Sequence, residues 1–283
     1  MRVLVAADRV ATLSAVAATE TIAAAFAARG AQVAAAPLAS DAESLSRLVP
    51  ADQLLRPETY AEALALLADS LRPGCVIDLT VASSAEPDFA ALQSCQRVGA
   101  VAGVTVITAG ATDQPLTGLN GLVAQTGRDR STDLAEIVSL DAAMAAWASG
   151  LGVTATAPGS GAAGGVGAVA LAAGARVMTP WGFAAEQLHV AATAAKADVI
   201  VTACEQLDAD DLGGPAVASI VEIAREVTRP IVVIAGNSFV PARQLRVLDI
   251  EAAYPLVSGP AGQSTTPEQL RQVAERVART WSW

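Results

Sequence analysis

Short runs of valine and isoleucine alternate along this chain with longer amphipathic segments rich in alanine and leucine. This alternation is typical of βαβ units, in which helices connect parallel strands and cover both faces of a sheet. It predicts strands at residues 3–7, 32–37, 75–81, 104–108, 197–202, 230–235 and 252–257. It predicts helices at residues 13–29, 57–71, 132–149, 216–227 and 266–281. The chain is therefore expected to form an α/β fold.

Several helix ends have clear sequence signals. Thr266 precedes Pro267, which places threonine at the N-cap and proline at the first helical position. Gly30 is expected to end the helix at 13–29. Thr132 or Ser131 is expected to cap the helix at 132–149.

The regular alternation is clearest near the two ends of the chain and weakest between about residues 83 and 182. We therefore predict a flavodoxin- or Rossmann-like parallel-sheet domain formed by residues 1–82 and 188–283. A smaller inserted α/β domain, residues 83–187, carries a Gly-rich loop. Parallel sheets of this kind bind ligands beyond the C-terminal ends of their strands, where the strand order reverses.

Composition excludes several classes of partner. The formal charge is −10, and the chain has one lysine, Lys196, and one histidine, His189, so nucleic acid and anionic membranes are disfavoured. Cys75, Cys95 and Cys204 are an odd number without the spacing of a metal site, which favours buried thiols in a reducing cytoplasm. No apolar stretch is long and continuous enough to predict a membrane span.

The Gly-rich loop at residues 159–167 runs directly into an Ala-rich helix. Backbone N–H groups at such a turn favour an anion, so the loop is a candidate site for a phosphate or a carboxylate. The alternative is that glycine only permits positive φ and close packing at this turn. The spacing also fits a dinucleotide-binding loop, but Pro158 interrupts the preceding segment and a suitable acidic residue is missing.

Acidic residues follow several predicted strands. Asp8, after the first strand, is expected to project into a cleft above the sheet or to cap the next helix. Asp208 belongs to an acidic cluster with Asp210 and Asp211, which suits either a divalent cation or a solvated loop.

Cys204 has no basic neighbour in sequence, so an inert thiol is expected. His189 has no Ser-His-Asp or metal pattern around it.

Four ordered segments resemble the bacterial glycerate kinases, which phosphorylate glycerate with ATP. Residues 113–121 are similar to the family's Asp-Asn-Pro-Leu-x-Gly-x-x-Gly stretch, and residues 161–167 match its Gly-Ala-Ala-Gly-Gly-x-Gly loop. Residues 197–202 and 230–236 resemble two of its strands. The resemblance implies catalytic residues Asp8 and Asp208, substrate-binding residues Glu43, Asp113 and Asn120, and phosphate-binding residues Gly161, Ala162, Ala163, Gly164 and Gly165. It also implies ATP and Mg²⁺ if the protein is active.

The departures from the family concern charge. The lysine that follows the family's first acid is absent after Asp8, and its acidic glycine loop keeps only Glu43. At residues 203–210 the family's Gly-Glu-Gly-Arg-x-Asp motif keeps only Asp208. A strand-rich segment before Thr59 is missing as well. Arg9 and Arg128 are the candidates to replace the lost cations.

Two functional interpretations follow. In one, the chain is a catalytically impaired or divergent glycerate-kinase-like protein, retained to bind a small carboxylate, a nucleotide, a partner protein or a second copy of itself. In the other, it is an active ATP-dependent kinase for glycerate or a related hydroxy acid. Phosphoryl transfer needs several cations around the transferred group, so their loss favours the first interpretation.

Overall fold

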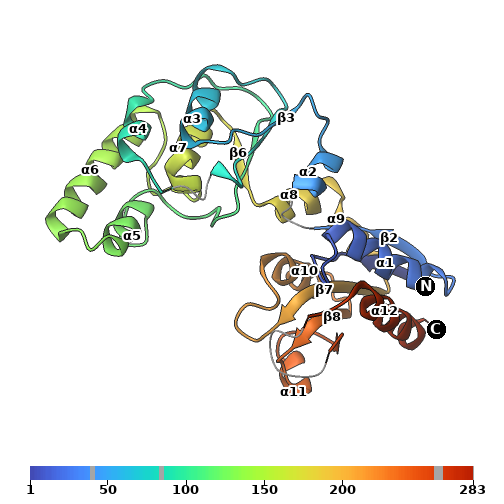
Figure 1. Cartoon of the computed structure of the whole chain (residues 1–283). Coiled ribbons are helices and arrows are strands. Elements are labelled where there is room, and N and C mark those ends of the chain that lie inside the picture. Colours follow the sequence, from blue (N-terminus) through green and yellow to red (C-terminus); the bar gives the residue numbers. More distant parts are fainter. Residues whose placement is uncertain (39–41, 83–85, 258–263, 283) are drawn as a thin grey trace. The chain divides into compact units, whose positions relative to one another are not determined.

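The computed structural model describes residues 1–38, 42–82, 86–257 and 264–282, without the side chains of residues 42–44 (Figure 1). The chain divides into two units. Unit 1 comprises Met1–Leu48 and Trp181–Trp283, and unit 2 comprises Val49–Pro180. The mixed α/β fold with parallel sheets that the sequence predicts is confirmed.

Unit 1 is built on a parallel sheet with strand order β2-β1-β7-β8-β9. Its strands are β1 (Arg2–Val5), β2 (Gln32–Ala35), β7 (Val199–Leu207), β8 (Ile231–Ser238) and β9 (Ala252–Pro255). Its helices are α1 (Ala15–Ala27), α2 (Ala42–Leu48), α8 (Pro180–Gln187), α9 (Val190–Ala194), α10 (Pro215–Glu226), α11 (Ala242–Leu245) and α12 (Pro267–Trp281). The strand order reverses between β1 and β7, as in flavodoxin-like sheets.

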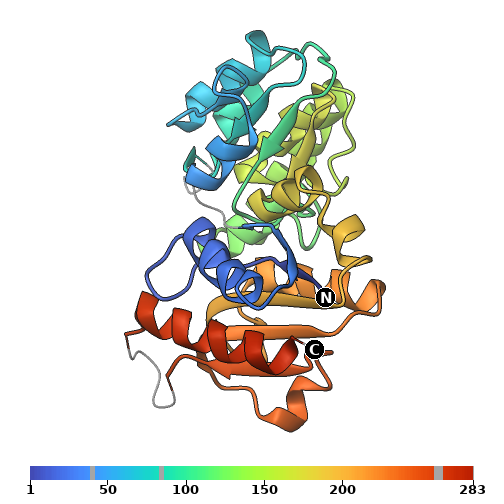
Figure 2. The ribbon, with the colours of Figure 1, turned by 90° about the vertical axis from the view of Figure 1, so that its right-hand side faces the viewer.

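Helices cover both faces of this sheet (Figure 2). On one face α1 and α12 lie side by side and bury Ile22, Phe26 and Val273 against alternate residues of β1, β7 and β8. On the other face α9 and α10 bury Val190, Val217 and further residues against the intervening positions of the same strands. Strands that are buried on both faces explain the continuous Val/Ile runs in the sequence.

Unit 2 has its own parallel sheet, in the order β3-β4-β5-β6. Its strands are β3 (Leu54–Leu55), β4 (Val76–Asp78), β5 (Thr105–Ile107) and β6 (Arg176–Met178). Its helices are α3 (Tyr60–Asp69), α4 (Phe89–Ser94), α5 (Leu122–Asp129), α6 (Leu134–Gly150), the 3₁₀ turn η2 (Ala163–Gly165) and α7 (Val166–Ala172). A separate core around Ile77, Leu92 and Met144 holds this unit together.

The boundaries between the units lie at 48/49 and 180/181, whereas the sequence predicted them at 82/83 and 187/188. Residues 49–82 contribute β3, α3 and β4 to unit 2, because β3 pairs with β4 and β4 pairs with β5. The sequence predicted the helix at 57–71 and the strand at 75–81 but not β3, and periodicity carries no information about which sheet a strand joins.

The helix caps agree with the sequence in part. Thr266 caps α12 in a capping box with Gln269, and Pro267 begins the helix, as predicted. The predicted cap of α6 is wrong, because Asp133 accepts the N–H of Ala135, whereas Ser131 has a left-handed φ of 55°.

In the part of the chain that is described, no helix combines the length and apolar character needed to cross a bilayer.

Candidate functional site

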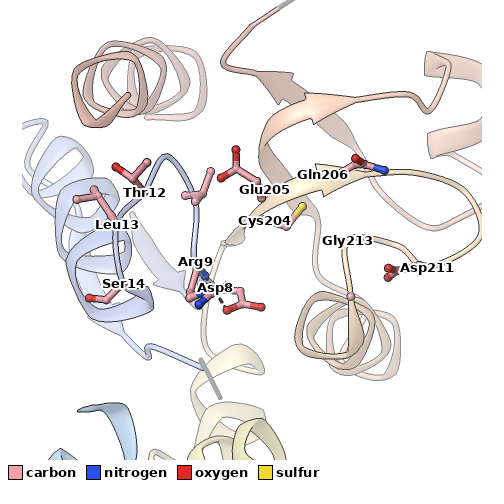
Figure 3. A pocket seen from close by; sticks show the side chains of 12 residues that line it. Asp8, Arg9, Thr12, Leu13, Ser14, Cys204, Glu205, Gln206, Asp211 and Gly213 are labelled. Carbon is pink, nitrogen blue, oxygen red and sulfur yellow. Dashed lines mark hydrogen bonds between the residues drawn. The ribbon is translucent and has the colours of Figure 1, made fainter. Parts of the chain in front are cut away.

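A hollow of about 670 Å³ opens in unit 1 beyond the C-terminal ends of β1 and β7, where the strand order reverses (Figure 3). The loop after β1, the end of β7 and the loop before α10 form its walls. It is lined by Asp8, Arg9, Val10, Thr12, Leu13, Ser14, Cys204, Glu205, Gln206, Asp211, Gly213 and Gly214. We call this hollow the switch-point pocket.

Asp8 and Arg9 lie together on one side of this pocket (Figure 3). The Asp8 N–H donates to the carbonyl of Ala203 at 3.0 Å, which continues the β1–β7 pairing, and its Oδ1 accepts the Arg9 N–H at 2.6 Å. Ser14, rather than Asp8, caps α1. The Arg9 side chain is exposed, and within the described ranges its guanidinium has no ion pair and no hydrogen bond.

Glu205, which sequence reasoning did not single out, holds the wall of the pocket in place. Its Oε2 accepts the Ala11 N–H and its Oε1 accepts the Thr265 hydroxyl, each at 2.8 Å. Ala11 and Thr12 have φ of 54° and 62°, a left-handed conformation that costs non-glycine residues about 1–2 kcal/mol each. The Glu205 carboxylate therefore stabilises a strained loop. The sequence signal that could have identified Glu205 is its position, as a charged residue directly after a buried strand segment.

Cys204 is buried at the floor of the pocket, as an inert thiol would be. A Cβ on Gly213 would lie 2.6 Å from its Sγ, so this glycine lets the loop before α10 close over the sulfur. Burial, helped by the carboxylates of Asp8 and Asp211, raises the pKa of the Cys204 thiol to about 12. The thiolate, which is the reactive form, is thus disfavoured at neutral pH.

Folding stability should consequently fall at high pH because of Cys204. The unfolded thiol loses its proton near pH 9, whereas the folded one keeps it up to about pH 12, so stability is fully present below pH 9 and decreases between these values. The loss approaches about 1.4 kcal/mol per pH unit. Urea unfolding at several pH values should give a steeper decline for wild type than for Cys204→Ala. Equal slopes would show that the thiol titrates normally.

Asp208 does not line the switch-point pocket. Its Oδ1 accepts the N–H groups of Asp210 and Asp211 at 3.1 and 3.0 Å, and its Oδ2 accepts the Gln206 amide at 3.1 Å. These bonds lower the pKa of Asp208, the N–H of Asp211 contributing most. The carboxylate therefore stabilises the turn after β7, and the predicted catalytic role has no geometric support in unit 1 itself.

The Gly-rich loop lies in unit 2, where much of its glycine serves packing. A Cβ on Gly161 would overlap the carbonyl of Pro115, one on Gly167 would overlap that of Gly159, and one on Gly165 would lie 2.5 Å from Leu92 Cδ1. Gly164 and Gly165 also have positive φ, 67° and 94°. The packing explanation of this loop is therefore sufficient for three of its glycines.

Most backbone N–H groups of the loop are also already used. Gly161, Ala162 and Gly165 donate to the carbonyls of Gln114, Gly159 and Gly161. Within the described part of the chain, the N–H groups of Ala163 and Gly164 have no acceptor. These two residues line a second hollow of about 260 Å³, together with Thr108, Gln114, Gln125, Thr126, Asp129 and others. Five residues, 161–165, were predicted to bind phosphate. In the described structure only Ala163 and Gly164 among them have a backbone N–H available to an anion.

Tyr60 fixes the loop from the side of α3. Its hydroxyl donates to the carbonyl of Gly164 at 2.8 Å. Burial, with a contribution from Asp88, raises the pKa of the Tyr60 phenol well above its ordinary value. The phenol therefore acts as a neutral donor that orients the Gly164 peptide.

Of the three predicted substrate-binding residues, the two whose side chains the structure describes, Asp113 and Asn120, lie in neither hollow. Asp113 and Asn120 are exposed on unit 2, and neither lines the second hollow, although Gln114 next to Asp113 does. Glu43 lies in α2, but its side chain falls outside the described residues.

The resemblance implies ATP with Mg²⁺, and the charges that line the switch-point pocket do not fit the triphosphate of ATP, although carboxylates such as these are ordinary Mg²⁺ ligands. Among the described residues, the lining of the switch-point pocket has three carboxylates, those of Asp8, Glu205 and Asp211, and one guanidinium, that of Arg9. Both oxygens of Glu205 already accept hydrogen bonds, and Arg128 donates to the carbonyl of Leu119 at 3.0 Å. The described residues contain no cluster of three or more His, Cys, Asp or Glu arranged to hold a metal ion.

Comparison with known proteins identifies similar sequences and a similar fold. The model of the glycerate kinase family matches residues 83–282. Uncharacterized proteins of Mycobacterium bovis and Mycobacterium tuberculosis are each 36% identical over 159 residues, which span 54% of this chain and 42% of each relative. A crystal structure from Salmonella typhimurium LT2, provisionally named glycerate kinase 2, is 18% identical with a TM-score of 0.63 over 99% of this chain and 98% of that one.

Proposed function

Because this chain belongs to the glycerate kinase family, we propose that it is a member in which phosphoryl transfer is impaired and whose retained activity is binding. The proposal rests on one observation, the excess of carboxylates over cations in the switch-point pocket. A transferred phosphoryl group needs cations to neutralise its charge, and removing one such group commonly lowers the rate at least about a hundredfold. An active family member would use ATP.

The ligand that suits the pocket best is a small acid with a single carboxylate. One guanidinium, that of Arg9, is exposed at the pocket and is available to pair with one carboxylate. A triphosphate would bring several negative charges next to Asp8, Glu205 and Asp211. Like charges at short range oppose such binding by several kcal/mol in total.

Thermal shift and a coupled kinase assay test this proposal together. A ligand at about 100 times its Kd stabilises the folded state by about 2.7 kcal/mol, which raises the melting temperature by several degrees. We expect glycerate to raise the melting temperature of wild type but not of Arg9→Ala, and Mg²⁺ with ATP or ADP to raise neither. We expect no ATP-dependent loss of glycerate above background.

The alternative, an active glycerate kinase, gives the opposite result. It predicts ATP-dependent consumption of glycerate that disappears in Asp8→Ala, whose carboxylate lies in the pocket. An active family member assayed in parallel supplies the reference rate. Turnover within about tenfold of that reference would contradict impairment, since the missing cations should cost more than this.

A further inference from the structure

Helix α6 is apolar on two opposite faces, only one of which is covered. Met144 and Ala148 are buried in the core of unit 2, and Leu140 packs against them. The opposite side of the helix has no charged residue and is exposed. It consists of Ala135, Val138, Ser139, Ala142, Ala146 and Ser149. Glu136 and Asp141 lie outside this face, and an uncharged helix face that is left exposed is suited to a protein contact.

The two ends of this face have complementary shapes. Towards its N-terminal end the side chains of Leu134 and Val138 project into solvent, with 72% and 60% of their surface exposed. Towards its C-terminal end the surface is hollowed by a cavity of about 380 Å³. Its lining comprises Gln93, Cys95, Gln96, Ala146, Trp147, Gly150 and Leu151.

The projecting and hollow ends lie at equal distances from Ala142. Val138 and Ala146 are each four positions from it, and Leu134 and Gly150 are each eight. Residues spaced by four and eight lie on one side of a helix, one and two turns from the centre. A two-fold axis through Ala142 would therefore place each projecting side chain of one copy beside the hollow of the other.

A neighbouring loop enlarges the apolar surface. Gly118 donates its N–H to Asp141 Oδ1 at 3.0 Å, which ties this loop to the flank of α6. The next residue, Leu119, is 88% exposed. The surface therefore extends beyond the helix itself.

We propose that this face of unit 2 binds a second copy of the chain, with the two α6 helices antiparallel about a two-fold axis at Ala142. Each Val138 lies against Ala146 of the other copy, and each Leu134 against its Gly150. One surface that carries both the projection and the matching hollow is what an isologous contact requires.

The size of the face indicates a reversible dimer. Seventeen residues make a helix of about 25 Å, and two such helices with the flanking Leu119 loops bury on the order of 1,000 Å² in total. That area lies at the lower end of specific interfaces. The formal charge of −10 opposes association through the rest of the surface, so a face without charge is where two copies approach at least cost.

Charge-swap variants measured by sedimentation or light scattering over a concentration series test this arrangement. Wild type should pass from monomer to dimer as concentration rises. Val138→Lys and Ala146→Glu should each weaken the dimer at least tenfold, because each buries two unpaired charges at the contact. The double variant should regain most of that loss, because each new lysine meets a glutamate of the other copy.

Val247→Lys is the matched control, since Val247 is 77% exposed and lies in unit 1. It should dimerise like wild type. Ala142→Cys adds a second readout: mild oxidation should join two copies by a disulfide across the axis, because the small residue brings the backbones close. A monomeric wild type, an unaffected Val138→Lys, or a double variant no stronger than the single ones would overturn the proposal. None of these results depends on whether the switch-point pocket binds a ligand.

Discussion

Gly167→Ala should destabilise unit 2 by at least about 3 kcal/mol, although alanine is the better helix former. Gly167 is the second residue of α7, where alanine would normally add about 1 kcal/mol of helix stability. Here a Cβ would overlap the carbonyl oxygen of Gly159 and lie 3.2 Å from the backbone N of Ala162. Those are backbone atoms, which cannot yield by changing a rotamer.

The surrounding structure leaves Gly159 little room to move away. Gly159 has φ of 85°, and a Cβ there would lie 2.8 Å from the carbonyl of Thr112. Its own carbonyl accepts the N–H of Ala162 at 3.1 Å. A shift of this carbonyl would therefore disturb the turn that leads into the Gly-rich loop.

Trp147 provides the readout, since it is the one tryptophan in unit 2 and packs against that unit's core. In a background whose other three tryptophans are replaced by phenylalanine, its fluorescence should report a melting temperature lower by roughly 10 °C in Gly167→Ala. Gly99→Ala is the control, because apart from Gly99 and its two chain neighbours no atom of the described structure lies within 4 Å of the Cβ it would add, and it should melt within about 2 °C of wild type. A stabilised Gly167→Ala would mean that the loop has more space than the structure shows.

The fold was largely predictable because buried parallel strands and amphipathic helices leave strong periodic patterns. The predicted strands at residues 197–202 and 230–235 became β7 and β8, the two longest strands. β7 continues to Leu207, beyond its predicted end, because pairing of Gln206 with Asn237 extends the ladder past the buried segment. Both residues of this pair are polar, and backbone pairing of polar residues leaves no hydrophobic pattern in a sequence.

The site was less predictable, because its geometry depends on contacts between distant segments. Asp8 was expected at the end of the first strand, and it lies in the switch-point pocket there. Glu205 was overlooked, because its partners Ala11 and Thr265 are 194 and 60 residues away. Asp208 has the right residue type after a strand, yet its carboxylate is occupied by its own turn. Spacing alone cannot distinguish a ligand-binding carboxylate from one that caps a turn.

Phe26→Ala should destabilise unit 1 by about 3–5 kcal/mol. Phe26 is fully buried on α1, where it packs with Ile22 against residues of α12 such as Val273. Aromatic residues make up only 4% of the chain, and much of the surrounding core is alanine and valine. Small side chains cannot extend into the space that a phenyl ring leaves, so the cavity should persist and the loss should lie near the upper end of this range.

Phe239→Ala is the matched control, since Phe239 also belongs to unit 1 but is 43% exposed. It should cost about 1 kcal/mol or less, because the removed ring was partly in water already. Urea unfolding followed by the fluorescence of Trp281, which packs against the same core as Phe26, measures both variants in a background whose other three tryptophans are phenylalanine. Because unit 2 has its own core around Ile77 and Met144, the Trp147 signal should change much less in Phe26→Ala. A similar loss in both tryptophan signals would show instead that the two units unfold as one cooperative body.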